Sequence, residues 1–207
     1  MNNQKVGIIR TGVANVASVQ AAFARLGCAP KLIETARDVE RLDSVVLPGV
    51  GSFAAGMASL NRLDLVQPLR ERFAADRPTL AICLGLQLLC AASEESPGVK
   101  GLGVIQQEVR ALRGSGLRVP QFGWNFVVAS AGMTYLRDGY AYYANSYGLL
   151  DDALGWQAAV TVYGSRFAAA IEHGNCLACQ FHPELSSSYG SELLGRWLSK
   201  SREVQPC

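Results

Sequence analysis

The chain has 207 residues, of which 49% are hydrophobic and 17% charged, and its formal net charge at pH 7 is +2. Such a composition predicts one soluble globular domain with a sizeable core. The small net charge and the lack of a Lys/Arg run argue against nucleic acid or an acidic membrane surface as a partner. The most apolar uncharged window, residues 79–93, is too short for a membrane span of roughly 20 residues.

The N-terminal residues and the cysteines indicate in which cellular compartment the protein is expected. Met1–Arg10 contains no apolar stretch of signal-peptide type, and Cys occurs at the irregular positions 28, 83, 90, 176, 179 and 207. This usage indicates reduced thiols in the cytoplasm and not a disulfide framework. We expect residues 1–200 to form a single domain and residues 201–207 to be a frayed tail.

Strands and helices are predicted to alternate in the first 92 residues. Helical spacing relates Val16, Val19, Phe23 and Leu26, and Gly27 is a C-cap signal. A further helix is expected over much of Phe53–Ala75, interrupted or started afresh near Pro68. Short apolar strands are predicted at Lys5–Ile9, Pro30–Ile33, Val45–Leu47 and Thr79–Ile82. This order predicts an α/β fold with a mostly parallel central sheet and helices on both faces.

After Ser93 the pattern changes to short strands separated by turn residues, which predicts a smaller antiparallel region. A final apolar strand is expected at Cys176–Phe181 and a closing helix at Ser191–Leu198. The other strands are predicted at Val104–Leu112, Phe126–Val128, Tyr140–Ala144, Gln157–Tyr163 and Phe167–Ile171.

Cys83 stands where one of these apolar strands stops and a helical pattern, Leu84–Ala92, begins. A Cys at such a joint has the geometry of a nucleophile elbow, and a helix start behind it favours the thiolate. Gly85 leaves room where a side chain would crowd the facing strand. A lone Cys in an apolar run is more often an inert core residue, so this interpretation depends on its companions.

Two other strand ends supply those companions. His182 follows the strand at Cys176–Phe181, and Glu184, two positions on, falls on the same side of an extended backbone and can orient the imidazole. Pro48-Gly49-Val50-Gly51 follows another strand, and its glycines free backbone N–H groups for an oxyanion hole. Because carboxyl ends of parallel strands meet at one edge of a doubly wound sheet, one site is predicted.

The motifs A-I-C-L-G-L-Q around Cys83 and Q-F-H-P-E around His182 resemble those of class I (triad) glutamine amidotransferases, which implies a flavodoxin-like three-layer fold. Within that family, roughly residues 5–199 resemble the glutaminase subunits of imidazole glycerol phosphate synthases. The segments behind this narrower resemblance are I-I-R-T-G-V-A-N-V-A-S-V at 8–19, L-P-G-V-G-S-F at 47–53, S-E-E-S at 93–96, G-L-G-V-I at 101–105, V-P-Q-F-G-W-N at 119–125, Y-Y-A-N-S-Y at 142–147 and C-Q-F-H-P-E at 179–184.

The resemblance implies glutamine hydrolysis with no cofactor and no metal. Cys83 would attack the side-chain carbonyl and form a thioester, His182 would pass the thiol proton to the leaving ammonia, and Glu184 would fix the imidazole. The implied oxyanion residues are Val50, Gly51 and Leu84, and the implied glutamine-binding residues are Gly49, Gln87, Asn145, Ser146 and Tyr147.

The resemblance also implies a partner. Ammonia would pass to a (β/α)₈-barrel synthase subunit in a heterodimer that makes imidazole glycerol phosphate and aminoimidazole carboxamide ribotide for histidine biosynthesis. Several residues depart from the pattern of these subunits, and some of them are expected near the partner. They are Arg10 for Asp, Ala81 for Gly, Gln121-Phe122 for His-Met, Asn145 for His, and Leu185 for Lys or Arg. For Ala81 we expect a small adjustment of the elbow.

Three alternatives stay open. A paralogous glutaminase could feed another acceptor enzyme, such as a surface-sugar amidotransferase or the pyridoxal phosphate synthase. A non-catalytic regulatory module could use the same fold, but the intact Cys83, His182 and Glu184 argue against it. A cysteine hydrolase of another substrate is disfavoured by Gln87 and the P-G-V-G segment.

Two features outside these motifs have ordinary explanations. His173, Cys176 and Cys179 have H-x-x-C-x-x-C spacing, which can indicate zinc. No second Cys pair accompanies them, and residues i and i+3 of a strand face opposite sides, so core packing is favoured. Trp124 fits a core residue and an interface anchor about equally well.

Overall fold

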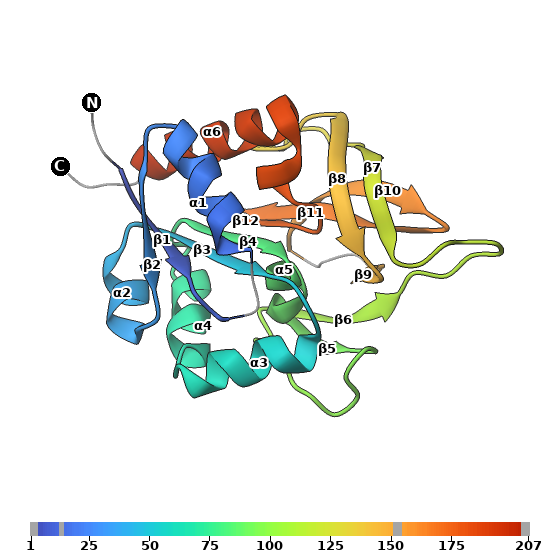
Figure 1. Ribbon diagram of the computed structural model, residues 1–207, viewed down its shortest axis with the longest axis horizontal. Coiled ribbons are helices and arrows are strands. Elements are labelled where there is room, and N and C mark those ends of the chain that lie inside the picture. Colours follow the sequence, from blue (N-terminus) through green and yellow to red (C-terminus); the bar gives the residue numbers. More distant parts are fainter. Residues whose placement is uncertain (1–3, 13–14, 151–154, 204–207) are drawn as a thin grey trace.

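A computed structural model of the protein describes residues 4–12, 15–150 and 155–203. Within these residues, seven strands form the main sheet in the order β10-β11-β12-β4-β3-β1-β2 (Figure 1). Neighbours from β12 to β2 are parallel, whereas β10 and β11 run antiparallel at one edge. The strands are β1 Lys5–Ile9, β2 Ala29–Ile33, β3 Ser44–Gly49, β4 Thr79–Cys83, β10 Gln157–Tyr163, β11 Ser165–His173 and β12 Cys176–Cys179. The parallel part has the flavodoxin-like order, as predicted.

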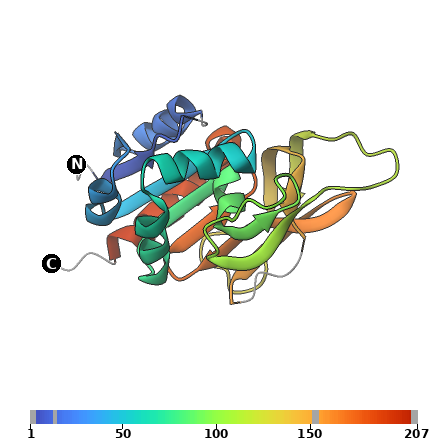
Figure 2. The same cartoon turned by 90° about the horizontal axis from the view of Figure 1, so that it is seen from below.

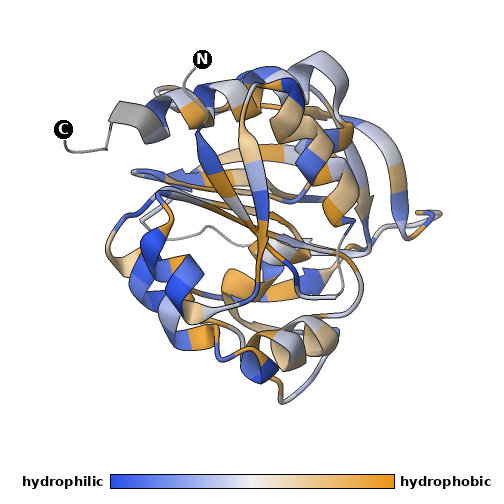
Figure 3. Ribbon diagram, turned by 60° about the vertical axis from the view of Figure 1, so that its left-hand side comes forward, coloured by the Kyte–Doolittle hydropathy of each residue, from blue (hydrophilic) through white to orange (hydrophobic). Residues whose placement is uncertain are grey.

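Helices cover both faces of this sheet (Figure 1). On one face lie α1, Val16–Arg25, and α6, Ser187–Glu203. On the other lie α2 Ala36–Arg41, α3 Phe53–Arg62, α4 Val66–Ala74 and the short α5 Leu84–Leu89. Figure 2 shows α3 and α4 in front of the sheet, and Figure 3 shows hydrophilic residues on the outward sides of helices.

Alternation along the buried strands divides the core into two layers. Leu80 and Ile82 of β4 belong to the layer under α1 and α6, where Phe23 meets Trp197 edge to face with ring centroids 6.1 Å apart. Ala81 belongs to the other layer, with the apolar residues of α3, α4 and α5. Because both faces of β4 are covered, its sequence is continuously apolar and not alternating.

The predicted helix over Phe53–Ala75 starts afresh near Pro68, as expected, because α4 begins at Val66. The chain leaves α3 after Arg62 and turns at Asp64, which has a φ of 52°. Pro68 lies in the first turn of α4, where its missing N–H has no helical partner to lose. Gly27 likewise ends α1 as expected, with a φ of 76°.

The helix predicted over Leu84–Ala92 is shorter than expected, because α5 ends at Leu89. The next residues form β5, Cys90–Ser93, which pairs with β6, Ile105–Ala111. β9, Tyr147–Leu149, pairs with the other edge of β6. Tertiary pairing with a distant strand therefore overrides the local helical pattern here.

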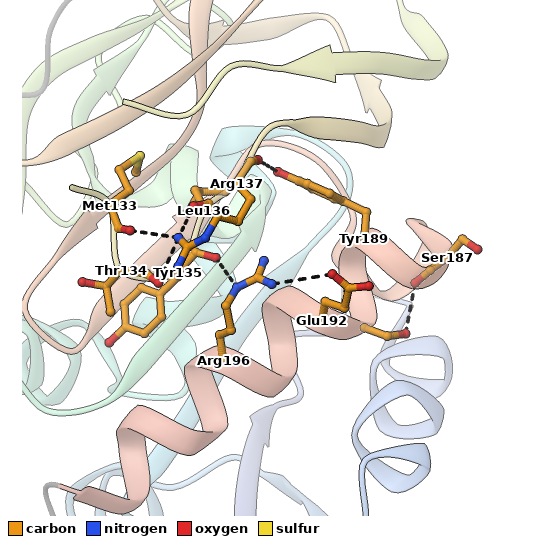
Figure 4. Close-up of polar contacts among 10 residues, drawn as sticks. Met133, Thr134, Tyr135, Leu136, Arg137, Ser187, Tyr189, Glu192 and Arg196 are labelled. Atoms are coloured by element: carbon orange, nitrogen blue, oxygen red, sulfur yellow. Dashed lines mark hydrogen bonds and ion pairs between the residues drawn. The ribbon is translucent and has the colours of Figure 1, made fainter. Parts of the chain in front are cut away.

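A hairpin of β7, Gln121–Val127, and β8, Gly139–Asn145, stands at the end of the molecule opposite both described termini (Figure 1). Its connecting loop is held by α6 (Figure 4). Arg196 donates to the carbonyl of Tyr135 at 2.7 Å, Tyr189 donates to the carbonyl of Arg137 at 2.9 Å, and Arg137 donates back to the carbonyl of Met133. These bonds hold the loop that leads into β8 against α6.

The last helix, α6, is longer than the closing helix predicted from the sequence. α6 continues to Glu203, so the helix runs into the segment expected to be frayed, and residues 204–207 lie outside the described residues. Ser201 is buried, and its hydroxyl donates to the carbonyl of Trp197. Among the described helices, none is both long and apolar enough to cross a membrane.

Candidate active site

The carboxyl ends of β3, β4 and β12 meet at a cavity of about 370 Å³. Most of the residues singled out from the sequence line it. The lining residues are Val50, Gly51, Cys83, Leu84, Gln87, Glu95, Pro120, Phe122, Ala144, Asn145, Ser146, Tyr147 and His182. Of the predicted set, Gly49 and Glu184 lie behind this lining. The position agrees with the rule that sites form beyond the carboxyl ends of parallel strands.

Cys83 is the last residue of β4 and has a φ of 55° and a ψ of −108°. A positive φ is rare for a residue with a side chain, and here it marks a sharp strand-to-helix turn. Close packing around Gly85 and Gly49 holds the backbone of this turn in place. A Cβ on Gly85 would lie 2.0 Å from the carbonyl oxygen of Leu47, and one on Gly49 would lie 2.9 Å from the Cβ of Leu84. The predicted elbow is thus present in the structure.

His182 and Glu184 form a buried pair, with Nδ1 of the imidazole 2.8 Å from a carboxylate oxygen. The prediction placed both on an extended segment. Instead, His182 is extended and Pro183–Leu185 is a single turn of 3₁₀ helix, η1, which curls the carboxylate back beneath the ring. The pairing was therefore expected, but its backbone geometry was not.

The charge state of His182 follows from its two partners. Burial lowers the pKa of His182, but hydrogen bonds to Cys83 and Glu184, together with their negative charges, outweigh it and raise the pKa to about 10. Cys83 is nearly buried and the imidazole faces it within hydrogen-bonding reach. At neutral pH this arrangement favours an imidazolium beside the sulfur.

The backbone around His182 is tied to β8 through Ser186. The N–H of His182 donates to the carbonyl of Tyr142 at 2.9 Å, and the Ser186 hydroxyl donates to the carbonyl of His182 at 2.6 Å. The same hydroxyl accepts from the N–H of Tyr142 at 3.0 Å. Strand β8 thereby sets where the imidazole stands over Cys83.

The segment after β3 enters the cavity and leads into α3. Gly51 has a φ of 97°, which favours glycine, and Ser52 caps the helix. Glu95 was not assigned a role from the sequence, yet it lines the cavity and accepts from the N–H of Phe53 at 2.6 Å. Only its place in the quoted S-E-E-S segment signalled it.

A chain of side-chain amides runs beside Cys83. The amide nitrogen of Gln87 donates to the carbonyl of Tyr147 and to the side-chain oxygen of Gln180, each at 3.1 Å. The amide nitrogen of Gln180 lies 3.8 Å from the sulfur of Cys83. Asn145 donates to the same carbonyl of Tyr147 at 3.0 Å. Gln180 was quoted as part of a motif, but no role was predicted for it.

The departures noted in the sequence are accommodated in different ways. Ala81 is buried between Leu47 and Ala178 on the neighbouring strands, and the elbow forms beside it. Arg10 forms an exposed ion pair with Glu34, and neither residue belongs to the cavity lining. Gln121 and Asn145 are buried opposite one another on β7 and β8, whereas Leu185 is largely exposed.

The sequence profile of the glutamine amidotransferase class-I family matches residues 8–200. The chain belongs to this family. A relative named imidazole glycerol phosphate synthase subunit HisH, from Idiomarina loihiensis, is 41% identical over 93% of this chain and 96% of its own length. The chloroplastic imidazole glycerol phosphate synthase hisHF of Arabidopsis thaliana is 39% identical over 93% of this chain, which corresponds to 34% of that longer protein.

Solved structures agree on the fold. A crystal structure of a glutamine amidotransferase has a TM-score of 0.75 and is 17% identical over 95% of this chain and 98% of its own. The structure of PurLQS from Thermotoga maritima has a TM-score of 0.72 at 14% identity, covering 97% and 98% of the two chains. The protein is accordingly a glutamine amidotransferase, an enzyme that hydrolyses glutamine.

The other thiols of this glutamine amidotransferase are placed differently from Cys83. Burial raises the pKa of Cys90 and of Cys176 to about 12, so both stay protonated at neutral pH. Cys176 and Cys179 belong to opposite core layers. His173 is exposed, and its ring contacts that of Trp156. Among the described residues no group of His, Cys, Asp and Glu has the arrangement of a metal site. Because the two sulfurs lie in opposite core layers, packing accounts for this pair of cysteines.

Proposed function

We propose that this enzyme is the glutaminase subunit of an imidazole glycerol phosphate synthase and that Cys83, His182 and Glu184 are its catalytic triad. The observation that carries the proposal is the buried 2.8 Å pair of His182 and Glu184, which directs the imidazole at a sulfur held on a strained elbow. The relatives with the HisH name, at about 40% identity, support the pathway.

The geometry gives each triad member one task. The Cys83 thiolate attacks the side-chain carbonyl carbon of glutamine, and the C–N bond breaks as His182 gives its proton to the departing nitrogen, which leaves as ammonia. Water then attacks the thioester, returns a proton to His182 and releases glutamate with the thiolate. Glu184 holds the imidazole in orientation and stabilises its positive charge. Backbone N–H groups of Val50, Gly51 and Leu84 are the proposed oxyanion donors.

Recognition of glutamine needs groups for its amino-acid end as well. Glu95 carries a carboxylate in the cavity lining, and we assign it to the α-ammonium group of the substrate. Gln87 uses its amide nitrogen on Tyr147 and Gln180, which leaves its carbonyl oxygen for the substrate. Gly49 sets the backbone path beside Leu84, and Asn145, Ser146 and Tyr147 form the opposite wall.

The ammonia acceptor is proposed to dock on the outer face of the β7–β8 hairpin. Phe122 is 71% exposed, Trp124 52% and Tyr140 61%, and Phe122 also lines the cavity. A contiguous exposed aromatic face of this kind is typical of a protein interface. The partner is proposed to be a (β/α)₈-barrel synthase in a cytoplasmic heterodimer with lyase activity. The long hisHF relative, in which the part matching this chain is about a third, supports a linked second component.

The triad is tested with Cys83→Ala. Because the variant lacks the proposed nucleophile, glutamine hydrolysis measured as glutamate release in the presence of the synthase partner should fall by at least about 10⁴-fold. Synthesis from added ammonium chloride should continue at the wild-type rate, since the partner uses ammonia directly. Residual glutaminase activity near that of the wild type would show that another residue is the nucleophile.

Copurification separates the proposed pathway from its main alternative, a paralogue that feeds another acceptor. Purification of the tagged wild-type chain with its bound partner should recover a barrel synthase, and that partner should switch on glutamine hydrolysis. Recovery of a sugar amidotransferase or a pyridoxal phosphate synthase subunit would assign the glutaminase to a different acceptor.

A further inference from the structure

We propose that Gln180 is a third side chain acting on the nucleophile: its amide N–H donates a hydrogen bond to the sulfur of Cys83, and Gln87 fixes the direction of that amide. The proposal rests on the proposed function in one respect, because it takes Cys83 as the attacking group. It adds a donor to the triad and connects that donor to the glutamine-binding wall.

The position of Gln180 comes from the sheet. The residue directly follows β12, the strand beside β4, and its backbone N–H donates to the carbonyl of Ala169 at 2.8 Å. The side chain is fully buried, and its nitrogen lies 3.8 Å from the Cys83 sulfur. This is an ordinary length for an N–H···S hydrogen bond, since sulfur is larger than oxygen. His182 stands two residues further on, so one strand end supplies two groups to the sulfur.

The orientation of the Gln180 amide follows from a chain of partners. The carbonyl of Tyr147 can only accept, so the end of the Gln87 amide that faces it must be nitrogen. The same nitrogen also faces Gln180, which must therefore present its oxygen to Gln87. The remaining end of Gln180, the NH₂ group, then faces Cys83. A backbone carbonyl thus determines, through two amides, that the sulfur receives a donor.

A donor in this place favours the ionised sulfur. A hydrogen bond to a charged group is stronger than one to a neutral group, so the N–H of Gln180 stabilises the thiolate more than the thiol. Because both ends of the amide are engaged and the side chain is buried, the group needs no reorganisation when the reaction begins. Burying an amide costs free energy unless the amide is hydrogen-bonded, so an apolar residue would fill this space at a lower cost. The buried amide therefore points to a role for its hydrogen bonds.

The test is the alkylation of Cys83 by iodoacetamide in the isolated subunit, without glutamine. Gln180→Met keeps the length of the side chain and removes the donor, and Gln180→Leu is a second variant in case the first does not fold. We expect the alkylation rate at neutral pH to fall about tenfold, the lower end for loss of a hydrogen bond to a charged group. The pH profile of alkylation should move to higher pH, with His182, Glu95 and Tyr147 as the other ionisable groups in the cavity lining and Glu184 paired with His182.

Gln87→Met tests the chain of amides. If Gln87 acts on Cys83 through Gln180, its loss should slow alkylation, and the double variant Gln87→Met/Gln180→Met should be no slower than Gln180→Met alone. Thr161→Val is the matched control, because it also removes a buried polar group without contacting the sulfur. Its alkylation rate should equal that of the wild type.

The outcomes separate this proposal from the proposed function. Unchanged alkylation rate and pH profile in folded Gln180→Met, with rapid alkylation of wild-type Cys83, would overturn the role of Gln180 and leave the triad intact. Additive effects of the two Met substitutions would overturn the orienting role of Gln87. If wild-type Cys83 itself reacts no faster than an unstructured thiol, the triad is wrong and not only its third partner.

Discussion

At the scale of single residues, the site depends on Cys83 being held in a conformation that a side chain normally avoids. A φ of 55° for a non-glycine residue costs on the order of 1–3 kcal/mol and persists only where the surroundings leave no alternative. Here the surroundings are the packed neighbours Gly49 and Gly85, whose missing side chains let Leu84 and Leu47 approach. The strain places the sulfur in the cavity, where the other described cysteines are not.

The pairing of His182 should appear as a dependence of stability on pH. The folded protein raises the pKa of His182 from its ordinary 6.5 to about 10, so the stabilisation is fully present below pH 6.5 and is lost as pH rises through about 10. We expect the wild type to lose free energy of unfolding relative to His182→Asn across this window. Urea unfolding of both proteins from about pH 6 to about pH 10 measures the difference.

The comparison with His182→Asn removes the contribution of other groups that titrate in the same window, because they are common to both proteins. A difference in the free energy of unfolding that stays constant, or grows as the pH rises, would contradict the assignment of His182 as the protonated partner of Cys83 and Glu184.

At the scale of elements, three adjacent strand ends and the tight crossing of α5 over β3 form the site. Gly85→Ala tests this crossing. The added Cβ would lie 2.0 Å from the carbonyl oxygen of Leu47, so α5 must move and carry Leu84 and Cys83 with it. We expect a loss of stability of about 2–4 kcal/mol in urea unfolding, together with a loss of glutaminase activity of at least about tenfold.

Gly195→Ala is the matched control for that substitution. Gly195 lies within α6, and a Cβ there meets no atom within 4 Å among the described residues. Alanine favours a helix interior over glycine by about 0.5–1 kcal/mol, so this variant should be slightly more stable and fully active. If both alanine variants behaved alike, close packing of α5 on β3 would not be what shapes the elbow.

At the scale of the whole molecule, the hairpin that carries the proposed docking face also holds His182. Trp124 packs edge to face on Tyr142, with centroids 6.0 Å apart, and the backbone of Tyr142 is bonded to both His182 and Ser186. A partner seated on these rings would therefore contact the strand that sets the imidazole. This arrangement provides a direct physical route by which docking could influence hydrolysis.

The docking face is tested with Trp124→Ala. Loss of an exposed aromatic anchor at an interface costs about 2 kcal/mol or more, so the dissociation constant for the synthase should rise by at least about 30-fold in titration calorimetry. Trp156→Ala is the control, since Trp156 contacts His173 at the far end of the sheet. Equal weakening by both substitutions, or by neither, would contradict docking on the hairpin.

Much of the fold could be predicted from residue types and their spacing. Continuous apolar runs predicted the buried parallel strands, because a strand covered on both faces has no polar side. Cys83 and His182 were predicted to meet because both follow strands of one parallel sheet, whose carboxyl ends share an edge. The elbow and the imidazole–carboxylate pair followed from residue type and spacing, although the expected extended geometry of Glu184 was wrong.

Other features depend on contacts between residues that are far apart in the chain. The end of α5 at Leu89 depends on β6, a strand that begins at Ile105, and local helical periodicity carries no information about such a partner. Glu95 and Gln180 enter the site through contacts with Phe53 and Cys83, which are far away in the sequence. The direction of a buried amide and the exposure of Trp124 likewise depend on which distant groups surround them, and only the folded chain brings those groups together.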